Sequence, residues 1–507
     1  MIVAALIPCL LPANAQVSAD QIRDRAAAAI GIERLEEVPR GVSLQGSIRY
    51  LDIPSRYSLL FDSSGRFVES IQGRLSETHG FDGSVCWTTD WCGLTRKVEL
   101  EERDLQITAT WLVTGFWTSR SSATELRIDD SDPSDGATEL ICSLSKTPMK
   151  VRLFIDEKSW LLTKATRTSV SGEQVWTFGN YKDFRGFKLP GLMTFSEAGV
   201  TNEIKVEKIE EAPTFVRNPY ELLPSASKNA SFRDVEPSNL EVKRLFTGHI
   251  CVSPTVDGKN VGWFILDSGA GVMVIDKSKA DELKLDPFGK LPVVGIGGVE
   301  VSHLRAGKTF DLGPLRISDP VYLELDLSMI SRAVGIELAG IAGFDVFASS
   351  IVDLDLDAPA IAIHNPGKFQ LSGGKWQRLW IDGKVPAVEA AYEGDRRGVF
   401  RLDTGAPNTV TFHSPTVEKY RLLEGRETKP AFIGGVGGAS KAVSGPMEWF
   451  EIAGHRFEKP QVVFSQAKSG AFADEYTVGN IGGEFLHPFR VVFDYTLSRI
   501  AFVKKAN

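Results

Sequence analysis

The sequence predicts an all-β protein with minor helices, and three observations lead to this prediction. The chain has 47 glycines and many Ser, Thr and Val residues, a composition that favours strands separated by frequent turns. Short runs of β-branched and aromatic residues recur along most of the chain, with turn residues between them. The second half also contains an internal repeat, in which short apolar runs alternate with glycine-rich turns.

Length and charge limit the organisation and the partners of the chain. A chain of 507 residues is too long for one ordinary core, so we expect two or three domains. A hydrophobic content of 43% and a charged content of 24% are typical of a soluble globular protein. The net charge is −8 and the basic residues are scattered, so nucleic acid is not an expected partner.

The N-terminus has the pattern of a targeting segment. Ile2 to Leu11 is an apolar run, and Ala13-Asn14-Ala15 is a small-x-small motif before Gln16. This pattern predicts a signal peptide over residues 1–15 and an exported protein, periplasmic or secreted. No Lys or Arg precedes the apolar run, so a mistaken start on a cytosolic protein stays open as the alternative. Beyond this segment, no stretch reaches the ~20 apolar residues that a membrane helix needs.

The cysteines permit disulfides but do not suggest a metal site. Removal of Cys9 with the signal peptide leaves Cys86, Cys92, Cys142 and Cys251, an even set in an exported protein. Cys86 and Cys92 flank a short Trp-rich loop, so we favour that pair. Close Cys-x-x-Cys and His-x-x-x-His pairs do not occur, and we expect neither a metal nor a cofactor.

Residues 16–212 are predicted to form an antiparallel β-rich domain. The segment from Gln16 to about Val38 is helical in character, because its apolar residues recur three and four positions apart and Gly31 follows them. The predicted strands are Ser43–Leu51, Arg66–Leu75, Leu105–Leu112, Glu139–Leu144, Val151–Ile155, Trp160–Thr168, Gln174–Tyr181 and Leu189–Phe195.

One phrase of this domain, the decapeptide YKDFRGFKLP at residues 181–190, adds a loose resemblance. With the repeated strands and the single helix, it resembles the open half-barrel of periplasmic lipoprotein-carrier domains. The tryptophans of the domain either line a ligand cavity or form the core of the sheet, and we favour the core. These residues are Trp87, Trp91, Trp111, Trp117 and Trp176.

A linker over residues 213–238 follows, with three prolines and a Ser/Asn-rich stretch. After it the chain repeats itself. The first copy reads WFILDSGA at residues 263–270, and the second reads VFRLDTGA at residues 399–406. Asp267 and Asp403 therefore occupy equivalent positions. We name residues 239–366 the first repeat and residues 367–507 the second repeat.

Two further features recur in the same order in both repeats. Each copy has a glycine-rich segment inside a predicted β-hairpin, and later an apolar segment in which we align Gly343 with Gly483. Each copy then ends in an Asp-containing strand and a final apolar strand. The glycine-rich residues are Gly295, Ile296, Gly297 and Gly298 in the first repeat, and Gly435, Val436, Gly437 and Gly438 in the second.

These residues resemble the retropepsin-like and pepsin-like aspartic proteases, over roughly half of the chain. The family signature is Asp-Thr/Ser-Gly-Ala at the end of a strand, a glycine-rich flap and a later apolar-apolar-Gly segment. The resemblance implies a bilobal acid-protease fold built from two retropepsin-like units, with Asp267 and Asp403 as catalytic residues. It also implies a supporting role for the signature-loop residues and substrate binding by the two glycine-rich flaps. The signature-loop residues are Ser268, Gly269, Thr404 and Gly405.

Paired carboxylates suit peptide hydrolysis for a physical reason. Two carboxyls a few Å apart do not both ionise easily, so they share one proton and their apparent pKa values separate. The ionised partner accepts a proton from water, and the protonated partner donates to the peptide carbonyl oxygen. The Ser268 and Thr404 hydroxyls are placed to form hydrogen bonds between the copies. The usual flap tyrosine of pepsin-like enzymes has no clear counterpart, which favours the retropepsin-like branch.

The sequence therefore predicts an aspartic-type endopeptidase that acts on polypeptides through water activated between Asp267 and Asp403. We expect a monomer in which the two repeats pair within one chain, and the connector between the repeats is short. Pairing of each repeat with its counterpart in a second chain stays open. The alternative from another class is a non-catalytic periplasmic peptide- or lipid-binding carrier on a protease-like fold.

Overall fold

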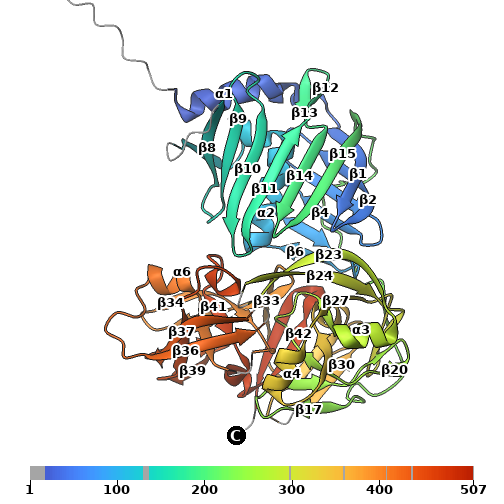
Figure 1. The fold of residues 1–507 in the computed structure, drawn as a ribbon, viewed down its shortest axis with the longest axis vertical. Coiled ribbons are helices and arrows are strands. Elements are labelled where there is room, and N and C mark those ends of the chain that lie inside the picture. Colours follow the sequence, from blue (N-terminus) through green and yellow to red (C-terminus); the bar gives the residue numbers. More distant parts are fainter. Residues whose placement is uncertain are drawn as a thin grey trace, which may run out of the picture.

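The computed structural model describes residues 17–129, 136–295, 298–357, 360–406, 408–435 and 438–505. The all-β prediction is confirmed, since strands dominate these described residues and the longest helix among them has 15 residues. Figure 1 shows an upper body formed by the N-terminal sheet and a lower body that contains both repeats. No helix in the described ranges is long and apolar enough to cross a membrane. The predicted signal peptide lies outside the described residues.

The upper body is one curved antiparallel sheet of 13 strands. Helix α1 (Ala19–Ile30) precedes it, within the segment predicted to be helical. It begins at a Ser18–Gln21 capping box and ends at Gly31 in the left-handed conformation. In spatial order the strands are β6 (Thr95–Val98), β5 (Cys86–Thr89), β4 (Glu77–Phe81), β3 (Phe67–Gln72), β2 (Ile53–Phe61), β1 (Val42–Tyr50), β15 (Val200–Glu211), β14 (Leu192–Glu197), β11 (Gly172–Gly179), β10 (Leu162–Ser169), β9 (Lys150–Asp156), β8 (Ala137–Leu144) and β7 (Thr124–Ile128). A separate hairpin pairs β12 (Lys182–Phe184) with β13 (Phe187–Leu189).

One predicted strand is wrong. Leu105–Leu112 belongs to helix α2 (Leu100–Thr114), which ends at Gly115 in the left-handed conformation. The β-branched residues of this segment suggested a strand, but the buried residues Ile107, Trp111 and Leu112 recur at helical spacing and pack against the sheet. Burial on one helical face therefore outweighs local strand propensity.

The cysteine and tryptophan predictions have different outcomes. The four cysteines of the described residues carry free thiols, so the expected Cys86–Cys92 disulfide is wrong. Cys86 packs in the core of the N-terminal sheet, donating its thiol to Gln106 at 3.1 Å, whereas Cys92 packs in the core of the lower body. Among the tryptophans, Trp111, Trp117 and Trp176 are buried in the core of the N-terminal sheet, as we favoured, whereas Trp91 packs against the core of the lower body.

The lower body contains two sheets with the same strand order. The first is β17 (Val242–Arg244), β18 (Ile250–Val252), β21 (Trp263–Leu266), β28 (Leu338–Ala342), β22 (Met273–Asp276), β27 (Val321–Leu325), β24 (Val299–Ala306) and β23 (Asp286–Val294). From β18 onward the order recurs in the second sheet, with the same parallel and antiparallel pairs. That sheet is β33 (Val385–Tyr392), β34 (Arg396–Leu402), β41 (Gly479–Ile481), β35 (Val410–Phe412), β40 (Gln461–Ser465), β37 (Gly438–Pro446) and β36 (Lys429–Gly435), with β38 (Trp449–Ile452), β39 (His455–Glu458) and β32 (Trp380–Asp382) beyond β33.

Short helices follow the strands of these sheets. They are α3 (Lys277–Leu283), α4 (Ser328–Val334), α5 (Phe344–Ser349) and α6 (Ser414–Lys419). The cap of α3 is Asp276, whose side chain accepts from the Ser278 N–H. A smaller sheet pairs one strand of the segment 213–238, β16 (Ala230–Phe232), with strands of the first repeat. Its order continues with β26 (Leu315–Ser318), β25 (Thr309–Leu312), β19 (Thr255–Val256) and β20 (Lys259–Asn260).

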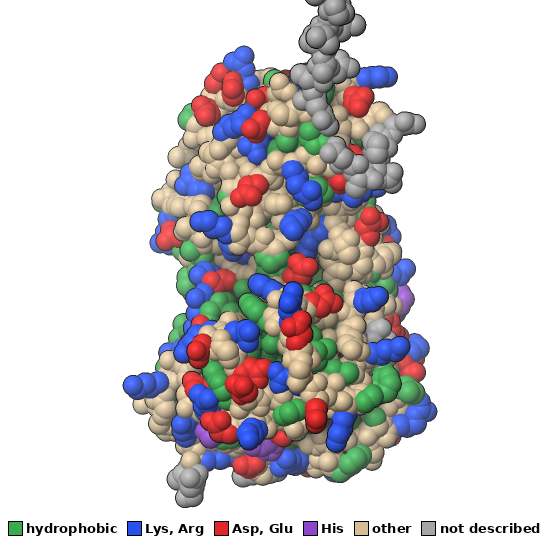
Figure 2. Space-filling view, turned by 90° about the vertical axis from the view of Figure 1, so that its left-hand side faces the viewer, with side chains coloured by type: hydrophobic (Ala, Val, Ile, Leu, Met, Phe, Trp, Pro, Cys, Tyr) green, Lys and Arg blue, Asp and Glu red, His purple; other side chains and the backbone are tan. Residues whose placement is uncertain are grey.

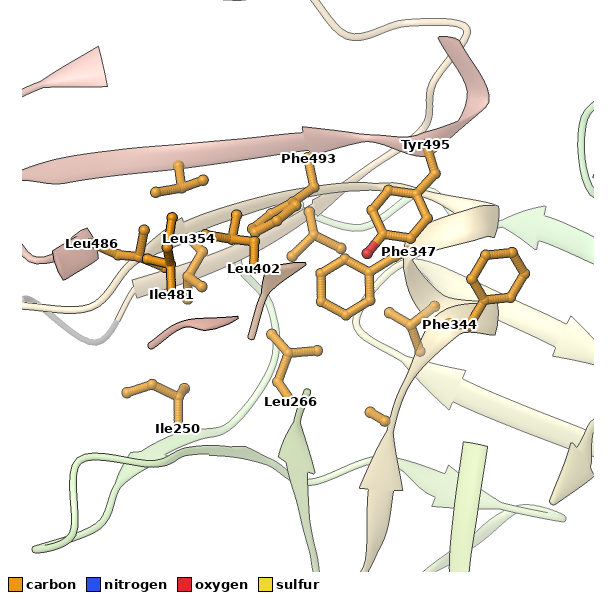
Figure 3. Packing of buried hydrophobic residues seen from close by; sticks show 14 of the residues in the cluster. Ile250, Leu266, Phe344, Phe347, Leu354, Leu402, Ile481, Leu486, Phe493 and Tyr495 are labelled. Carbon is orange, nitrogen blue, oxygen red and sulfur yellow. The ribbon is translucent and has the colours of Figure 1, made fainter. Parts of the chain in front are cut away.

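A further sheet joins the two repeats. Its order is β30 (Ala360–His364), β29 (Ile351–Asp355), β42 (Phe489–Asp494), β43 (Arg499–Lys504) and β31 (Trp376–Arg378). Because β29 and β42 come from different repeats and pair directly, the repeats share one hydrophobic core. Figure 3 shows Leu266 and Leu402, the residues before the two aspartates, in this core with Ile481 and Tyr495.

Candidate active site

Asp267 and Asp403 lie at equivalent points of the two sheets. Each comes directly after a strand, β21 or β34, and each donates its backbone N–H to a neighbouring strand. The Asp267 N–H donates to the Ala342 carbonyl at 3.0 Å, and the Asp403 N–H donates to the Ile481 carbonyl at 3.0 Å. The parallel pairs β21–β28 and β34–β41 therefore fix both aspartates in the same backbone setting.

Reciprocal hydrogen bonds hold the two aspartate loops together. The Ser268 N–H donates to Thr404 Oγ1 at 2.9 Å, and the Thr404 N–H donates to Ser268 Oγ at 3.1 Å. Each hydroxyl in turn donates across the interface, Ser268 to the Leu402 carbonyl at 2.8 Å and Thr404 to the Leu266 carbonyl at 3.0 Å. Both side chains are buried. These are the hydrogen bonds between copies that the sequence predicts, and they bring the loops of one chain together.

The glycine of each loop lies against the carboxyl of the other loop. A methyl group on Gly269 would lie 2.7 Å from Cγ of Asp403, and one on Gly405 would lie 2.3 Å from Cγ of Asp267. Separations this short leave no room for a side chain. The Gly269 N–H also donates to Asp267 Oδ1 at 2.7 Å. The two glycines therefore let the carboxyls approach each other.

Burial and the neighbouring carboxyl change the pKa of Asp267. Burial raises its pKa well above the usual value, and the negative charge of Asp403 raises it further. The backbone N–H groups of Gly269 and Gly405 act in the opposite direction but do not cancel the rise. Asp267 therefore retains its proton above the pH range that is usual for aspartate.

The sequence did not identify Asn480 as part of this site. Its Nδ2 donates to Asp403 Oδ2 at 2.9 Å, and the residue is only 5% exposed. The sequence does contain a feature that marks it, because Asn480 is a polar residue in the short apolar strand before Gly482-Gly483. The structure also shifts our alignment by one position, since Gly343 and Gly482 both approach the carbonyl oxygens of the aspartate loops.

The predicted flaps are β-hairpins, β23–β24 and β36–β37. At the end of the first hairpin the Gly295 N–H donates to the Gly298 carbonyl at 2.8 Å, and at the end of the second Gly435 pairs with Gly438. Ile296, Gly297, Val436 and Gly437 lie outside the described residues.

The first flap hairpin is attached to the N-terminal sheet. The Lys290 N–H donates to the Leu51 carbonyl at 2.8 Å, and the Arg74 guanidinium lies 3.8 Å from the centre of the Phe288 ring. In Figure 1, β23 and β24 lie directly under the upper body. This hairpin therefore rests on the N-terminal sheet at its stem.

A buried charge network also joins the N-terminal sheet to the second repeat, at the turn between β32 and β33. Lys384 in this turn lies 3.5 Å from Glu77 and 3.8 Å from Asp90. Arg96 pairs with Asp90 at 2.8 Å and donates to the Ile381 carbonyl at 3.3 Å. The same turn contacts the Asp267 loop, because a methyl group on Gly271 would lie 3.1 Å from the Gly383 carbonyl oxygen. Outside this interface, Figure 2 shows charges of both signs spread over the face in view.

Replacement of Thr404 by valine tests the reciprocal bonds. Valine has a similar shape but leaves the Ser268 N–H and the Leu266 carbonyl without their buried partner. We expect the free energy of unfolding to fall by about 2–4 kcal/mol, measured by urea denaturation. Thr177→Val, which removes an exposed hydroxyl pair on the N-terminal sheet, is the control and should change stability by less than about 0.5 kcal/mol. Equal effects of the two variants would contradict the role of Thr404.

Asp382, beside the charge network, gives a stability prediction with a defined pH window. Burial, assisted by the charges of Glu102 and Asp474, raises its pKa to about 8. The protonated carboxyl is therefore favoured in the folded state, so its stabilising contribution is full below the unfolded pKa of ~3.8 and is lost as the pH rises to about 8. Asp382→Asn should raise the unfolding free energy by about 2–5 kcal/mol at pH 8 and change it little at pH 4. An effect of equal size at both pH values would contradict this.

Comparison with known proteins agrees with this geometry for part of the chain. A family model described as aspartyl protease matches residues 252–346, which include Asp267 and the first flap hairpin. Residues 252–346 form an aspartyl-protease-like region. No curated protein sequence matches the chain.

Three solved structures resemble parts of the chain. A LolA superfamily protein from Nitrosomonas europaea is 16% identical, with 39% of this chain and 96% of that one covered and a TM-score of 0.29. A DUF1329 family protein from Desulfovibrio piger is 9% identical, with 38% of this chain and 92% of that one covered and a TM-score of 0.28. Basic 7S globulin from soybean is 11% identical, with 53% of this chain and 94% of that one covered and a TM-score of 0.34.

Proposed function

We propose that this protein is an aspartic-type endopeptidase that hydrolyses peptide bonds with Asp267 and Asp403. The observation that carries the proposal is the opposed pair of aspartate loops, in which each glycine lies against the other loop's carboxyl. The raised pKa of Asp267 supports it, because a carboxyl pair needs one protonated and one ionised member at the same pH.

The reaction follows from this arrangement. The ionised carboxyl accepts a proton from a water molecule held between the pair, and the water oxygen attacks the peptide carbonyl carbon. The protonated carboxyl donates its proton to the carbonyl oxygen, which becomes a hydroxyl of the tetrahedral intermediate. The carboxyl that took a proton from water then donates it to the nitrogen as the C–N bond breaks, and the other carboxyl takes back a proton from a hydroxyl of the intermediate, which restores the pair. No covalent bond to the enzyme forms in these steps.

We further propose that residues 239–507 are two tandem retropepsin-like units that form one site within the chain. The common strand order, the shared β29–β42 pairing and the reciprocal Ser268–Thr404 bonds support this arrangement. An extended polypeptide would lie between the two flap hairpins, where backbone groups can bond to it. The sequence of residues 1–15 supports export, so we propose that the enzyme acts outside the cytoplasm.

Peptide-library digestion tests the proposal. The purified chain is incubated with the library from pH 3 to pH 8, and the cleavage products are identified by mass spectrometry. Internal cleavage at a reproducible set of sites, blocked by a statine-type transition-state analogue, is expected. Absence of cleavage over the whole range, with peptide or lipid bound to the purified chain, would overturn the proposal in favour of a non-catalytic carrier.

A further inference from the structure

The two carboxyls of the site have unequal surroundings. Asn480 on β41 pairs with Thr411 and lies beside Arg401, and it donates to Asp403. The equivalent residue on β28 is Ile341, which pairs with Val274 and offers no polar atom from its side chain. One member of the pair therefore has a buried amide donor, and at the same register position the other has an aliphatic side chain.

The remaining groups around the pair increase this difference. His249 interacts electrostatically with Asp403 and with the Gly405 backbone, while Tyr495 of the shared core interacts electrostatically with Asp267. Burial lowers the pKa of His249, although Asp403 acts to raise it, and burial raises the pKa of Tyr495 well above the usual value. Asp403 thus has the Asn480 amide and His249 as side-chain neighbours, whereas Asp267 has the Tyr495 hydroxyl and the Gly269 N–H.

Hydrogen-bond chemistry connects this arrangement to protonation. An amide N–H that donates to a carboxylate stabilises the ionised form, because a charge-assisted bond is stronger than a neutral one. Asp267 receives the Gly269 N–H, yet its pKa remains well above the usual value because burial and the Asp403 charge outweigh that donor. The Asn480 amide that donates to Asp403 at 2.9 Å therefore favours the ionised form of Asp403 and places the shared proton on Asp267.

We propose that Asn480 is a positioning residue that makes Asp403 the ionised member of the pair. Asp403 is then the general base that takes the proton from water, and Asp267 is the general acid that donates to the carbonyl oxygen. This assignment rests on the proposed endopeptidase function. Asn480 touches neither proton directly and acts through Asp403.

The pH dependence of Asn480→Ile, which installs the side chain of the equivalent position, tests this role. Without the amide donor Asp403 ionises at higher pH, so the acidic limb of the kcat/KM profile should move up by about one pH unit. The basic limb, which reports the loss of the Asp267 proton, should move less. An unchanged acidic limb, or an equal fall in activity at every pH, would overturn the proposal. A shift of the acidic limb to lower pH would also overturn the proposal, since it would mean that the Asn480 amide accepts a hydrogen bond from a protonated Asp403.

A second variant and a second readout keep the test independent of folding and of turnover. The double variant Asn480→Ile with Ile341→Asn moves the donor to the other repeat, and it should bring the acidic limb back toward its original position. Carbon-13 NMR of the aspartate carboxyls in the full chain should show Asp403 ionising before Asp267, with a smaller separation in Asn480→Ile. If the wild type does not cleave peptides, the proposed function fails. If Asp267 ionises first, or Asn480→Ile leaves the carboxyl titration unchanged, this inference fails.

Discussion

Replacement of Asp403 by asparagine is expected to lower kcat/KM for peptide hydrolysis by about 10³- to 10⁴-fold. Asparagine has almost the same shape but cannot take a proton from water, so the base of the reaction is lost. Asp267→Asn should have a loss of similar size, because the general acid is lost. The measurement is the initial rate of cleavage of one library-derived peptide across the pH range.

The size of the loss also distinguishes pairing within a chain from pairing between chains. If each repeat paired with its counterpart in a second chain, two independent sites would form, and each single variant would keep about half of the activity of the wild type. A mixture of the two variants should stay inactive if the site lies within one chain. Asp395→Asn, in the exposed turn before β34, is the matched control and should retain full activity.

Stability measurements separate this loss of activity from a loss of folding. The folded-state pKa of Asp267 is raised, so the stabilising contribution of the protonated carboxyl is full below the unfolded pKa of ~3.8 and is lost as the pH rises through the folded pKa. Asparagine is neutral at every pH, so the variant does not lose this stabilising contribution as the pH rises. Asp267→Asn should therefore be at least as stable as the wild type at pH 7, measured by thermal denaturation. An inactive variant that is also unfolded would leave the catalytic role of Asp267 unsupported.

Much of the candidate site could be predicted because its residues are close together in the sequence. The strand, the aspartate, the hydroxyl and the glycine occupy consecutive positions in each copy, and a repeat of such a block predicts that both copies fold alike. The same local logic predicted helix α1, from its apolar spacing and Gly31, and the flap hairpins.

Residues that act through long-range contacts could not be predicted in this way. Asn480 reaches Asp403 only because β41 lies beside β34, a neighbour relation that no local pattern specifies. Helix α2 was missed because its burial against the sheet is a tertiary effect. The same is true of Lys384, which is an ordinary turn residue in the sequence but meets acidic residues of a distant sheet.

Replacement of Lys384 by methionine is expected to reduce the free energy of unfolding by about 3–5 kcal/mol. Methionine keeps much of the side-chain volume but removes the cation that lies near Glu77 and Asp90 and 3.5 Å from the centre of the Trp91 ring. Glu77 and Asp90 are at most 9% exposed at their side chains, so water cannot replace the lost charge. Urea denaturation measures the change.

Lys208→Met is the matched control for this prediction. Lys208 also pairs with a glutamate, Glu210 at 2.6 Å, but its side chain is 60% exposed, so its loss should change stability by less than about 0.5 kcal/mol. If Lys384→Met lowered the free energy of unfolding as little as Lys208→Met, the charge network would not hold the N-terminal sheet to the second repeat. With the expected loss, the N-terminal sheet behaves as an integral support of the first flap hairpin and the Asp267 loop. Its removal should then inactivate the enzyme rather than release an active protease.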